Sequence, residues 1–259
     1  MVAVSNRARG RLESGELALG VGIRILRSVE VAKAMKSAGF DWLFIDLEHG
    51  ALSIETAAQI CIAALDVGIS PLVRIPNGDF SLGTRLLDNG ALGIVVPHVE
   101  SAEEARTVVE RLRYPPQGHR AQFSNMPQFD YQSVPDLAAS LNEANLIAVM
   151  LESENAVGAA EAIAAVPGID VLLIGTSDLC IDMGLPDDFD HDKVAKAYAH
   201  TIESCRKHGK WAGMAGVYEE KLMQRYIAMG ARFILAGGDL GFLMDGAARR
   251  AEFLREIDR

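Results

Sequence analysis

The chain has 259 residues, of which 49% are hydrophobic and 23% charged, a composition that excludes a disordered, collagenous or coiled-coil protein. Its formal net charge of −10, without a basic cluster, argues against nucleic acid or an anionic membrane surface as the main partner. No apolar run approaches the ~20 residues that cross a bilayer, and the N-terminus lacks a signal-peptide stretch. With three widely spaced cysteines, these features favour a cytoplasmic location.

Short β-prone runs alternate with longer helical patterns along almost the whole chain. Several runs, such as residues 93–97, are continuously apolar, which indicates strands buried on both faces. Ser101, before two glutamates, predicts a helix N-cap, and Gly68 and Gly90 predict helix ends. The predicted strands cover residues 17–23, 42–46, 71–75, 93–97, 146–151, 171–175, 211–215 and 233–236. The predicted helices cover residues 29–37, 54–67, 80–89, 102–112, 156–165, 194–207 and 219–229.

Eight strand–helix units without a change in composition predict one α/β domain over residues 1–259, a (β/α)₈ TIM barrel. A doubly wound open sheet is the alternative, but no Gly-x-Gly-x-x-Gly follows the first strand. The irregular stretch from 114 to about 136 is predicted to be a lid or an interface arm. Residues 239–259 carry apolar side chains at helical spacing, which alone favours packing on the same barrel over docking onto a neighbouring chain.

Acidic side chains follow predicted strands five and six at the end of the barrel where TIM-barrel active sites lie. Glu152 comes directly after residues 146–151, and Asp178 comes shortly after residues 171–175. Carboxylates on adjacent strands can share a hard divalent cation such as Mg²⁺ or Mn²⁺. The structural alternative is a helix-capping acid at Glu152 and a turn at Asp178.

His49 and Arg74 follow predicted strands two and three at the same end. An imidazole suits proton transfer near neutral pH, and Asp46, three residues earlier, can orient it. Arg74 can bind a substrate carboxylate or stabilise an enolate oxygen. The structural alternatives are an ordinary core histidine and a salt bridge from Arg74 to Asp46 or Glu48.

Other catalytic chemistries lack the residues they need. No lysine lies inside or at the carboxyl end of a predicted strand, which argues against a Schiff-base mechanism. Serine hydrolysis lacks its Gly-x-Ser-x-Gly elbow. Gly237 and Gly238, after the last strand, are expected to form a tight turn rather than a phosphate site.

Six motifs, in this order, resemble the HpcH/HpaI aldolase family over roughly residues 20 to 251, and together they are highly specific. They are Phe44-Ile45-Asp46-Leu47-Glu48-His49, Val73-Arg74, Leu86-Leu87-Asp88-Asn89-Gly90-Ala91, Arg113-Tyr114-Pro115-Pro116-Gln117-Gly118-His119-Arg120, Leu151-Glu152-Ser153 and Ile174-Gly175-Thr176-Ser177-Asp178-Leu179. Members of this family are metal-dependent pyruvate aldolases with a (β/α)₈ barrel.

The resemblance implies a ligand set and a quaternary structure. Glu152 and Asp178 would hold a divalent Mg, Mn or Co ion, with pyruvate oxygens completing its coordination and Ser177 also touching substrate. The last helix would be exchanged between subunits of a homo-oligomer, commonly a hexamer built as a trimer of dimers.

The resemblance also implies catalytic roles. His49 would be the general base, made more basic by Asp88, for which an adjacent subunit is one source, and supported by Asp46. Arg74 would bind substrate and stabilise the enolate.

Two departures from the family pattern fall at the expected substrate site. Met150 stands where the family usually has a glutamine that hydrogen-bonds pyruvate. His98 stands where the residue after the proline is often apolar, and we expect both side chains at the substrate. These departures leave the predicted metal and enolate machinery in place. They leave open which 2-oxo acid is the aldol donor and which aldehyde is the acceptor.

The sequence therefore predicts a class II aldolase that reversibly cleaves a 4-hydroxy-2-oxo acid to pyruvate, or a close 2-oxo acid, and an aldehyde. A CoA-thioester lyase of the citrate lyase β or malyl-CoA lyase type and an oxaloacetate decarboxylase are alternatives with related chemistry. A non-catalytic 2-oxo-acid-binding protein is a further alternative. The presence of His49, Arg74, Glu152 and Asp178 together argues against it, because binding alone needs no base.

Overall fold

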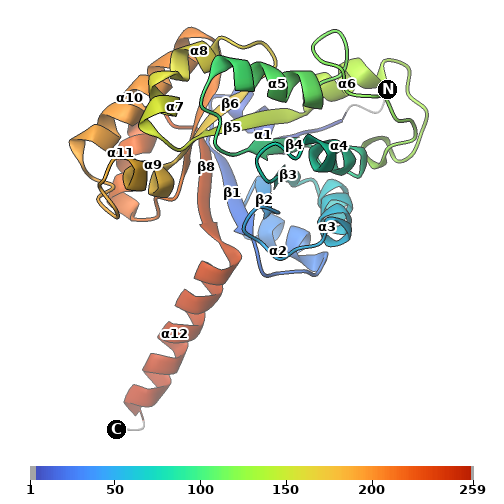
Figure 1. Cartoon of the computed structure of the whole chain (residues 1–259). Helices are drawn as coiled ribbons and strands as arrows, with labels where there is room; N and C mark the ends of the chain where they lie inside the picture. Colours follow the sequence, from blue (N-terminus) through green and yellow to red (C-terminus); the bar gives the residue numbers. More distant parts are fainter. Residues whose placement is uncertain (1–3, 258–259) are drawn as a thin grey trace.

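The computed structural model describes residues 4–257 and contains a closed barrel of eight parallel strands in the order β1 to β8 (Figure 1). The predicted (β/α)₈ barrel is confirmed, and the open-sheet alternative is wrong because β1 pairs with both β2 and β8. The strands are β1 (Ala18–Ile23), β2 (Trp42–Asp46), β3 (Ser70–Arg74), β4 (Gly93–Val96), β5 (Leu146–Leu151), β6 (Val171–Gly175), β7 (Trp211–Ala215) and β8 (Phe233–Gly238).

Six of the seven predicted helices lie within two residues of their expected bounds. They are α2 (Glu30–Ser37), α3 (Ile54–Val67), α4 (Phe80–Asp88), α5 (Ala102–Leu112), α10 (Asp192–Lys207) and α11 (Glu220–Met229). Ser101 caps α5 through a hydrogen bond from the Glu104 backbone N–H, as expected. The predicted helix over 156–165 is instead divided into α7 (Glu154–Gly158) and α8 (Ala160–Ala164). The sequence did not predict α1 (Arg7–Glu13), η1 (Pro127–Phe129), α6 (Leu137–Ala144) or α9 (Thr176–Asp182).

The strands are buried on both faces, which explains their continuous apolar runs. Outward-pointing side chains such as Val73 and Ile94 pack in the layer shared with the helices, whereas Phe44 and Leu72 belong to the cluster inside the barrel. Inside, the Trp42 ring stacks on Phe233 with centroids 4.0 Å apart. The interior of the barrel is therefore a packed core rather than a channel.

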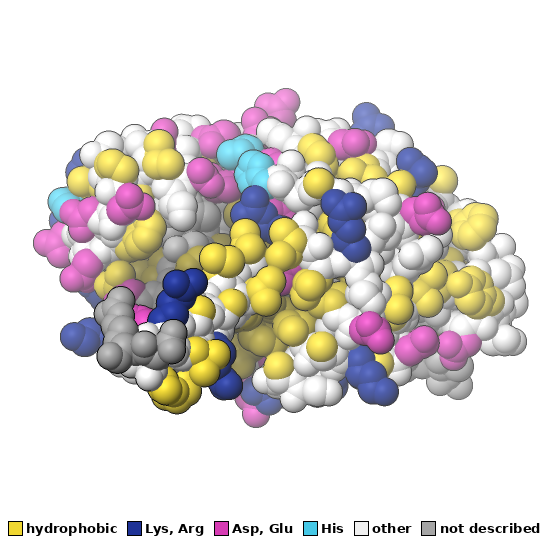
Figure 2. Space-filling model, turned by 90° about the horizontal axis from the view of Figure 1, so that it is seen from below, with side chains coloured by type: hydrophobic (Ala, Val, Ile, Leu, Met, Phe, Trp, Pro, Cys, Tyr) yellow, Lys and Arg dark blue, Asp and Glu magenta, His cyan; other side chains and the backbone are white. Residues whose placement is uncertain are grey.

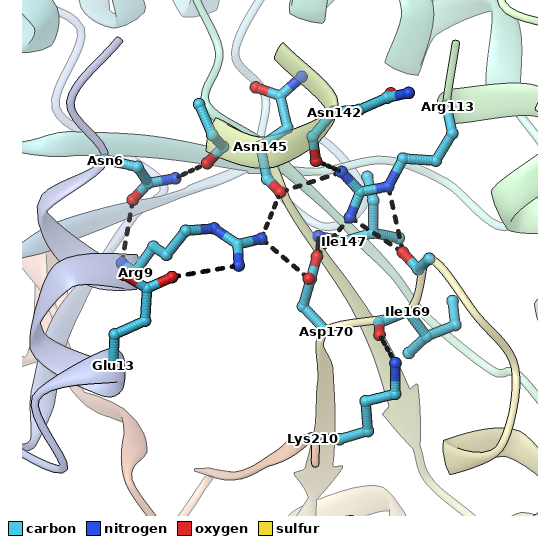
Figure 3. A network of polar contacts seen from close by, with 12 residues as sticks. Asn6, Arg9, Glu13, Arg113, Asn142, Asn145, Ile147, Ile169, Asp170 and Lys210 are labelled. Carbon is cyan, nitrogen blue, oxygen red and sulfur yellow. Dashed lines mark hydrogen bonds and ion pairs between the residues drawn. The ribbon is translucent and has the colours of Figure 1, made fainter. Parts of the chain in front are cut away.

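Helix α1 closes the amino-terminal end of the barrel and is held there by ion pairs (Figure 3). Asp170 accepts hydrogen bonds from Arg9 Nη2 at 2.8 Å, from Arg113 Nη2 at 2.5 Å and from the Ile147 backbone N–H at 2.7 Å. Leu12 of α1 joins the apolar cluster inside the barrel. This end is therefore sealed, and the open end lies at the carboxyl ends of the strands.

The irregular stretch from 114 to about 136 packs beside α4 and α6. Tyr114, Met126 and Phe129 form a small apolar cluster with α6, and Gln128 Nε2 donates to the Leu87 carbonyl at 2.6 Å. None of its residues lines the cavity at the carboxyl ends of the strands, so it is not a lid over that cavity within this chain. Its predicted role as an interface arm stays a prediction.

Helix α12 (Asp239–Ile257) projects away from the barrel as a single rod (Figure 1). Every side chain from Leu240 to Ile257 is exposed, so the packing on the same barrel that spacing alone favoured is wrong. The last two residues of the predicted stretch, 258 and 259, lie outside the described residues. Figure 2, seen from the side to which α12 projects, shows apolar side chains on this helix and on the neighbouring face. The exposed large apolar residues of α12 are Leu240, Phe242, Leu243, Met244, Phe253, Leu254 and Ile257.

Within residues 4–257, no helix combines the length and the apolar character needed to pass through a lipid bilayer.

Candidate active site

A cavity of about 570 Å³ opens at the carboxyl ends of the strands, and seven of the eight strands, all except β4, contribute to its lining. Phe44, Met150 and Leu235 give it apolar walls, whereas Asp46 and Arg74 bring charge to it. This size and this mixture of walls are typical of sites for small molecules. The strand-end rule thus locates the cavity correctly.

Asp46 and Arg74 form a buried ion pair at the floor of the cavity. Arg74 donates to Asp46 through Nε at 3.0 Å and Nη2 at 2.7 Å, and its Nη1 lies 3.1 Å from Glu48 Oε2. Burial opposes the charge of Asp46, but the hydrogen bonds and charge of Arg74 hold the pKa of this carboxyl below its ordinary value. Arg74 is thus oriented by two carboxylates, and both salt-bridge partners expected as alternatives are present.

His49 follows β2 in a turn that Asp46 organises. Asp46 Oδ1 accepts the backbone N–H groups of Glu48 and His49, each at 3.1 Å. The His49 side chain is 57% exposed and lines the cavity, with Nε2 3.8 Å from Glu48 Oε2. Asp46 therefore supports the backbone of His49 rather than its imidazole, which leaves the ring accessible to a ligand.

Glu152 is a buried carboxylate at the end of β5, with no Lys or Arg ion pair among residues 4–257. Its Oε2 accepts the His98 backbone N–H at 2.8 Å and lies 3.1 Å from His98 Nδ1. Burial raises the pKa of Glu152, and the negative charge of Asp178 adds to the rise. Gly175 makes room for this carboxylate, because a Cβ there would lie 2.6 Å from Glu152 Cγ.

Ser177 and Asp178 lie in the first turn of α9 and line the cavity. The helix start is fixed by Thr176, whose Oγ1 lies 2.7 Å from both the Tyr198 hydroxyl and the Ala215 carbonyl. Gly216 permits a close approach here, since a Cβ would lie 2.8 Å from Ser177 Oγ. The unpredicted helix α9 is therefore the element that positions two of the expected site residues.

The carboxylates at the carboxyl ends of the strands fit a divalent cation that takes only some of its ligands from the protein. Glu152 and Asp178 are close enough for the charge of one to raise the pKa of the other. No cluster of three or more His, Cys, Asp or Glu side chains suited to a metal occurs in residues 4–257. Two carboxylates would leave the remaining positions to water and substrate oxygens, which is how Mg²⁺ is often bound.

Of the other expected site residues, one lines the cavity and two do not. Met150 lines it, whereas His98 does not and instead contacts Glu152. Asp88 lies at the end of α4, paired with Arg120 Nη2 at 2.5 Å, and has no contact with His49 among the described residues. A single chain therefore does not bring Asp88 to His49.

Three further polar residues belong to this site, of which the sequence named only Glu48, and only as a salt-bridge partner of Arg74. Glu48 contacts Arg74 and lies 3.8 Å from both His49 and His98. Arg24 and Tyr218 line the cavity from the segments after β1 and β7. The signal was available for Arg24, because it follows the first strand directly, as Arg74 ends the third.

Comparisons with known proteins agree with this geometry. The model of the HpcH/HpaI aldolase/citrate lyase family matches residues 26–245. The chain is 38% identical to a 4-hydroxy-4-methyl-2-oxoglutarate aldolase of Hapsidospora irregularis, over 99% of this chain and 97% of that protein. It is 31% identical to a 5-keto-4-deoxy-D-glucarate aldolase of Klebsiella pneumoniae, over 97% of each chain.

Among solved structures, an HpcH/HpaI aldolase from Desulfitobacterium hafniense superimposes with a TM-score of 0.92 at 28% identity, covering 97% of this chain and 98% of that one. The family match covers strands β2 to β8 and the cavity residues from Phe44 to Gly241, whereas β1, Gly22 and Arg24 precede it. The chain belongs to the HpcH/HpaI aldolase/citrate lyase family.

Proposed function

We propose that this protein is a class II aldolase, a carbon–carbon lyase that cleaves a 4-hydroxy-2-oxo acid to pyruvate, or a close 2-oxo acid, and an aldehyde. The observation that carries the proposal is the meeting of His49, Arg74 and Asp178 around one cavity, with Glu152 buried behind Gly175. The names of the two aldolase relatives support it.

Glu152 and Asp178 are the residues that would hold a divalent Mg, Mn or Co ion. When bound, such a cation supplies the positive charge that an enolate oxygen requires. The absence of a Lys or Arg ion pair to the buried Glu152 among the described residues supports this role, since a buried carboxylate needs a compensating positive charge. His98 would keep Glu152 in place through the two contacts described above.

The side chains of this chain would then handle the proton and the developing charge. His49, exposed at the cavity, removes the proton from the substrate hydroxyl as the carbon–carbon bond breaks, a contribution of about 10²–10⁴-fold. The aldehyde departs, and the remaining electron pair forms the enolate of pyruvate, whose carbon is then protonated. Arg74, held by Asp46 and Glu48, presents fixed positive charge to the enolate.

Met150 supplies no hydrogen bond from the wall where it lies, so it shapes the pocket for the 2-oxo acid rather than polarising it. Ser177 and Asp178 add the polar groups at the start of α9. We also propose that residues 1–259 form one domain, because all strands from Ala18 to Gly238 belong to one closed sheet.

We further propose a cytoplasmic homo-oligomer, a hexamer, in which α12 packs on another copy and Asp88 reaches a neighbouring His49. The apolar residues that α12 exposes support this assembly, since a helix of this length gains its stability from packing. The exposure of the His49 ring also leaves room for a group from a neighbour.

The decisive experiment is a retro-aldol assay of the purified protein with 4-hydroxy-2-oxo acids. Pyruvate release is followed through lactate dehydrogenase, with and without Mn²⁺, Mg²⁺ or Co²⁺. We expect turnover that EDTA abolishes and added Mn²⁺ restores. Turnover that resists EDTA, or faster cleavage of malyl-CoA than of any free keto acid, would overturn the proposal.

A further inference from the structure

Arg24 is a cation of the cavity whose guanidinium has one long ion-pair contact and donates no hydrogen bond within residues 4–257. It follows β1 directly, its side chain is 55% exposed, and it lines the cavity. Its only close charged neighbour among residues 4–257 is Asp46, with Nε 3.8 Å from Asp46 Oδ2, and its side chain donates no hydrogen bond to the described residues. Arg74, by contrast, already makes two hydrogen bonds to Asp46 and contacts Glu48.

The backbone of Arg24 is rigidly held, although its guanidinium donates no hydrogen bond within the described residues. Oδ2 of the buried Asp239 accepts three consecutive backbone N–H groups, from Arg24 at 3.1 Å, Ile25 at 2.9 Å and Leu26 at 2.8 Å. Asp239 is the first residue of α12, and β1 pairs with β8, so the barrel closure itself fixes this loop. The Cα of Arg24 is therefore preorganised at the cavity, unlike that of an arginine on a mobile loop.

The neighbours of Arg24 favour an anion as its partner. Asp46 already accepts four hydrogen bonds, two from Arg74 and two from backbone N–H groups, so it competes weakly for Arg24. The Tyr218 hydroxyl lies in the field of both Arg24 and Arg74, which oppose the rise in its pKa that burial causes. A guanidinium and a phenol hydroxyl that line the same cavity are two donors that suit a carboxylate.

We propose that Arg24 binds a second carboxylate of the substrate, the one on the aldehyde portion, and so selects dicarboxylic 4-hydroxy-2-oxo acids. This inference rests on the proposed aldolase function, in which Arg74 and the two acids Glu152 and Asp178 serve the pyruvate portion. Arg24 reaches the cavity from the segment after β1, lies farther from Asp46 than Arg74 does, and carries the charge that the second carboxylate requires. Arg24 is then a specificity-determining residue rather than part of the enolate machinery.

The test compares two substrates that differ at one group. 4-Hydroxy-2-oxoglutarate carries a carboxylate where 4-hydroxy-2-oxopentanoate carries a methyl group, and both release pyruvate. We expect the wild-type protein to prefer the dicarboxylate. Arg24→Gln is expected to lower kcat/KM for the dicarboxylate by about 10- to 100-fold, the range of a lost charge-assisted hydrogen bond, and to change the monocarboxylate less than threefold.

The matched control is Arg27→Gln, which removes the same charge. Arg27 is exposed, lies three residues after Arg24 and does not line the cavity. This control is expected to leave unchanged the ratio of the kcat/KM values for the dicarboxylate and the monocarboxylate. Arg24→Lys, which keeps the charge and loses the fork of donors, is expected to fall between the wild type and Arg24→Gln. The proposal would be overturned if Arg24→Gln lowered kcat/KM equally for both substrates, or if Arg27→Gln changed the ratio of the two kcat/KM values as much as Arg24→Gln does.

A binding measurement separates this inference from the proposed function. 2-Oxoglutarate and 2-oxopentanoate are not cleaved, and they differ in the same carboxylate and methyl group. By calorimetry, Arg24→Gln is expected to weaken 2-oxoglutarate about 10-fold or more and to leave 2-oxopentanoate unchanged. Unchanged binding of 2-oxoglutarate refutes the role of Arg24, whereas selective weakening without any aldol cleavage in the wild type refutes the aldolase function alone.

Discussion

Asp46 links the stability of the site to pH. Its pKa is held below the ordinary value by Arg74, although burial opposes this, so its charged form stabilises the folded state at neutral pH. That stabilisation is present above the pKa of an unfolded aspartate and is lost as the pH falls through the lowered pKa of the folded state. Below pH 4, therefore, protonation of this buried carboxyl contributes to unfolding.

Replacing Asp46 with Asn tests this linkage. The substitution leaves Arg74 with Glu48 alone, and we expect a loss of about 3 kcal/mol at pH 7, the scale of a broken buried ion pair. The difference between variant and wild type should shrink as the pH falls below 4, as urea denaturation at each pH would measure. Asp66→Asn, at an exposed carboxylate on α3, is the control and should show neither effect.

His49 is expected to matter for turnover and not for metal binding. His49→Ala should lower kcat by about 10²–10⁴-fold, because the general base is lost while Glu152 and Asp178 remain. Mn²⁺ affinity, followed by electron paramagnetic resonance, should not change. His200→Ala, on the exposed face of α10, is the matched control. Turnover of His49→Ala within threefold of the wild type would contradict the assigned role.

At the scale of elements, the close packing of β6 against Glu152 is the feature that prepares the metal site. Gly175→Ala places a methyl group 2.6 Å from Glu152 Cγ and 2.8 Å from its Oε1, so the carboxylate must move. We expect Mn²⁺ affinity and kcat to fall at least 10-fold. Gly158→Ala, in α7 with nothing within 4 Å of the new Cβ, should keep both and add about 0.5–1 kcal/mol of stability. Unchanged Mn²⁺ binding in Gly175→Ala would refute this packing argument.

The strands were predictable because each is a short apolar run buried on both faces, bounded by glycines and polar residues. Helix α9 was not, because Thr176-Ser177-Asp178 has the composition of a loop, and its start is held by the hydrogen bonds of Thr176 to Tyr198 and Ala215. These partners are distant in sequence and meet only after the barrel has closed.

The sequence predicted most of the candidate site, but not all of it. Strand ends are read directly from the sequence, so His49, Arg74 and Asp178 were selected and lie around one cavity. Arg24 was missed although it follows the first strand, because its fixed backbone depends on Asp239, more than 200 residues later. Pattern spacing contains no information on such a pairing.

In the molecule as a whole, α12 projects from the barrel, and its residues from Leu240 to Ile257 are exposed. The double substitution Leu243→Glu/Leu254→Glu places two charges 11 residues apart, on one face of the helix. We expect it to reduce the assembly to smaller species, as light scattering coupled to size exclusion would show. Arg249→Gln/Arg250→Gln changes the net charge equally and should retain the wild-type mass. A wild-type protein that is monomeric at micromolar concentration would contradict the proposed assembly.

Glu152 and Asp178 are proposed to hold one divalent cation between them. Anomalous diffraction from a crystal grown with Mn²⁺ tests it most directly, because manganese identifies itself at its absorption edge. We expect one strong anomalous peak within about 2.3 Å of a carboxylate oxygen of each residue, and its loss in Glu152→Gln. A manganese peak elsewhere in the barrel, or none at a concentration that sustains full turnover, would contradict it.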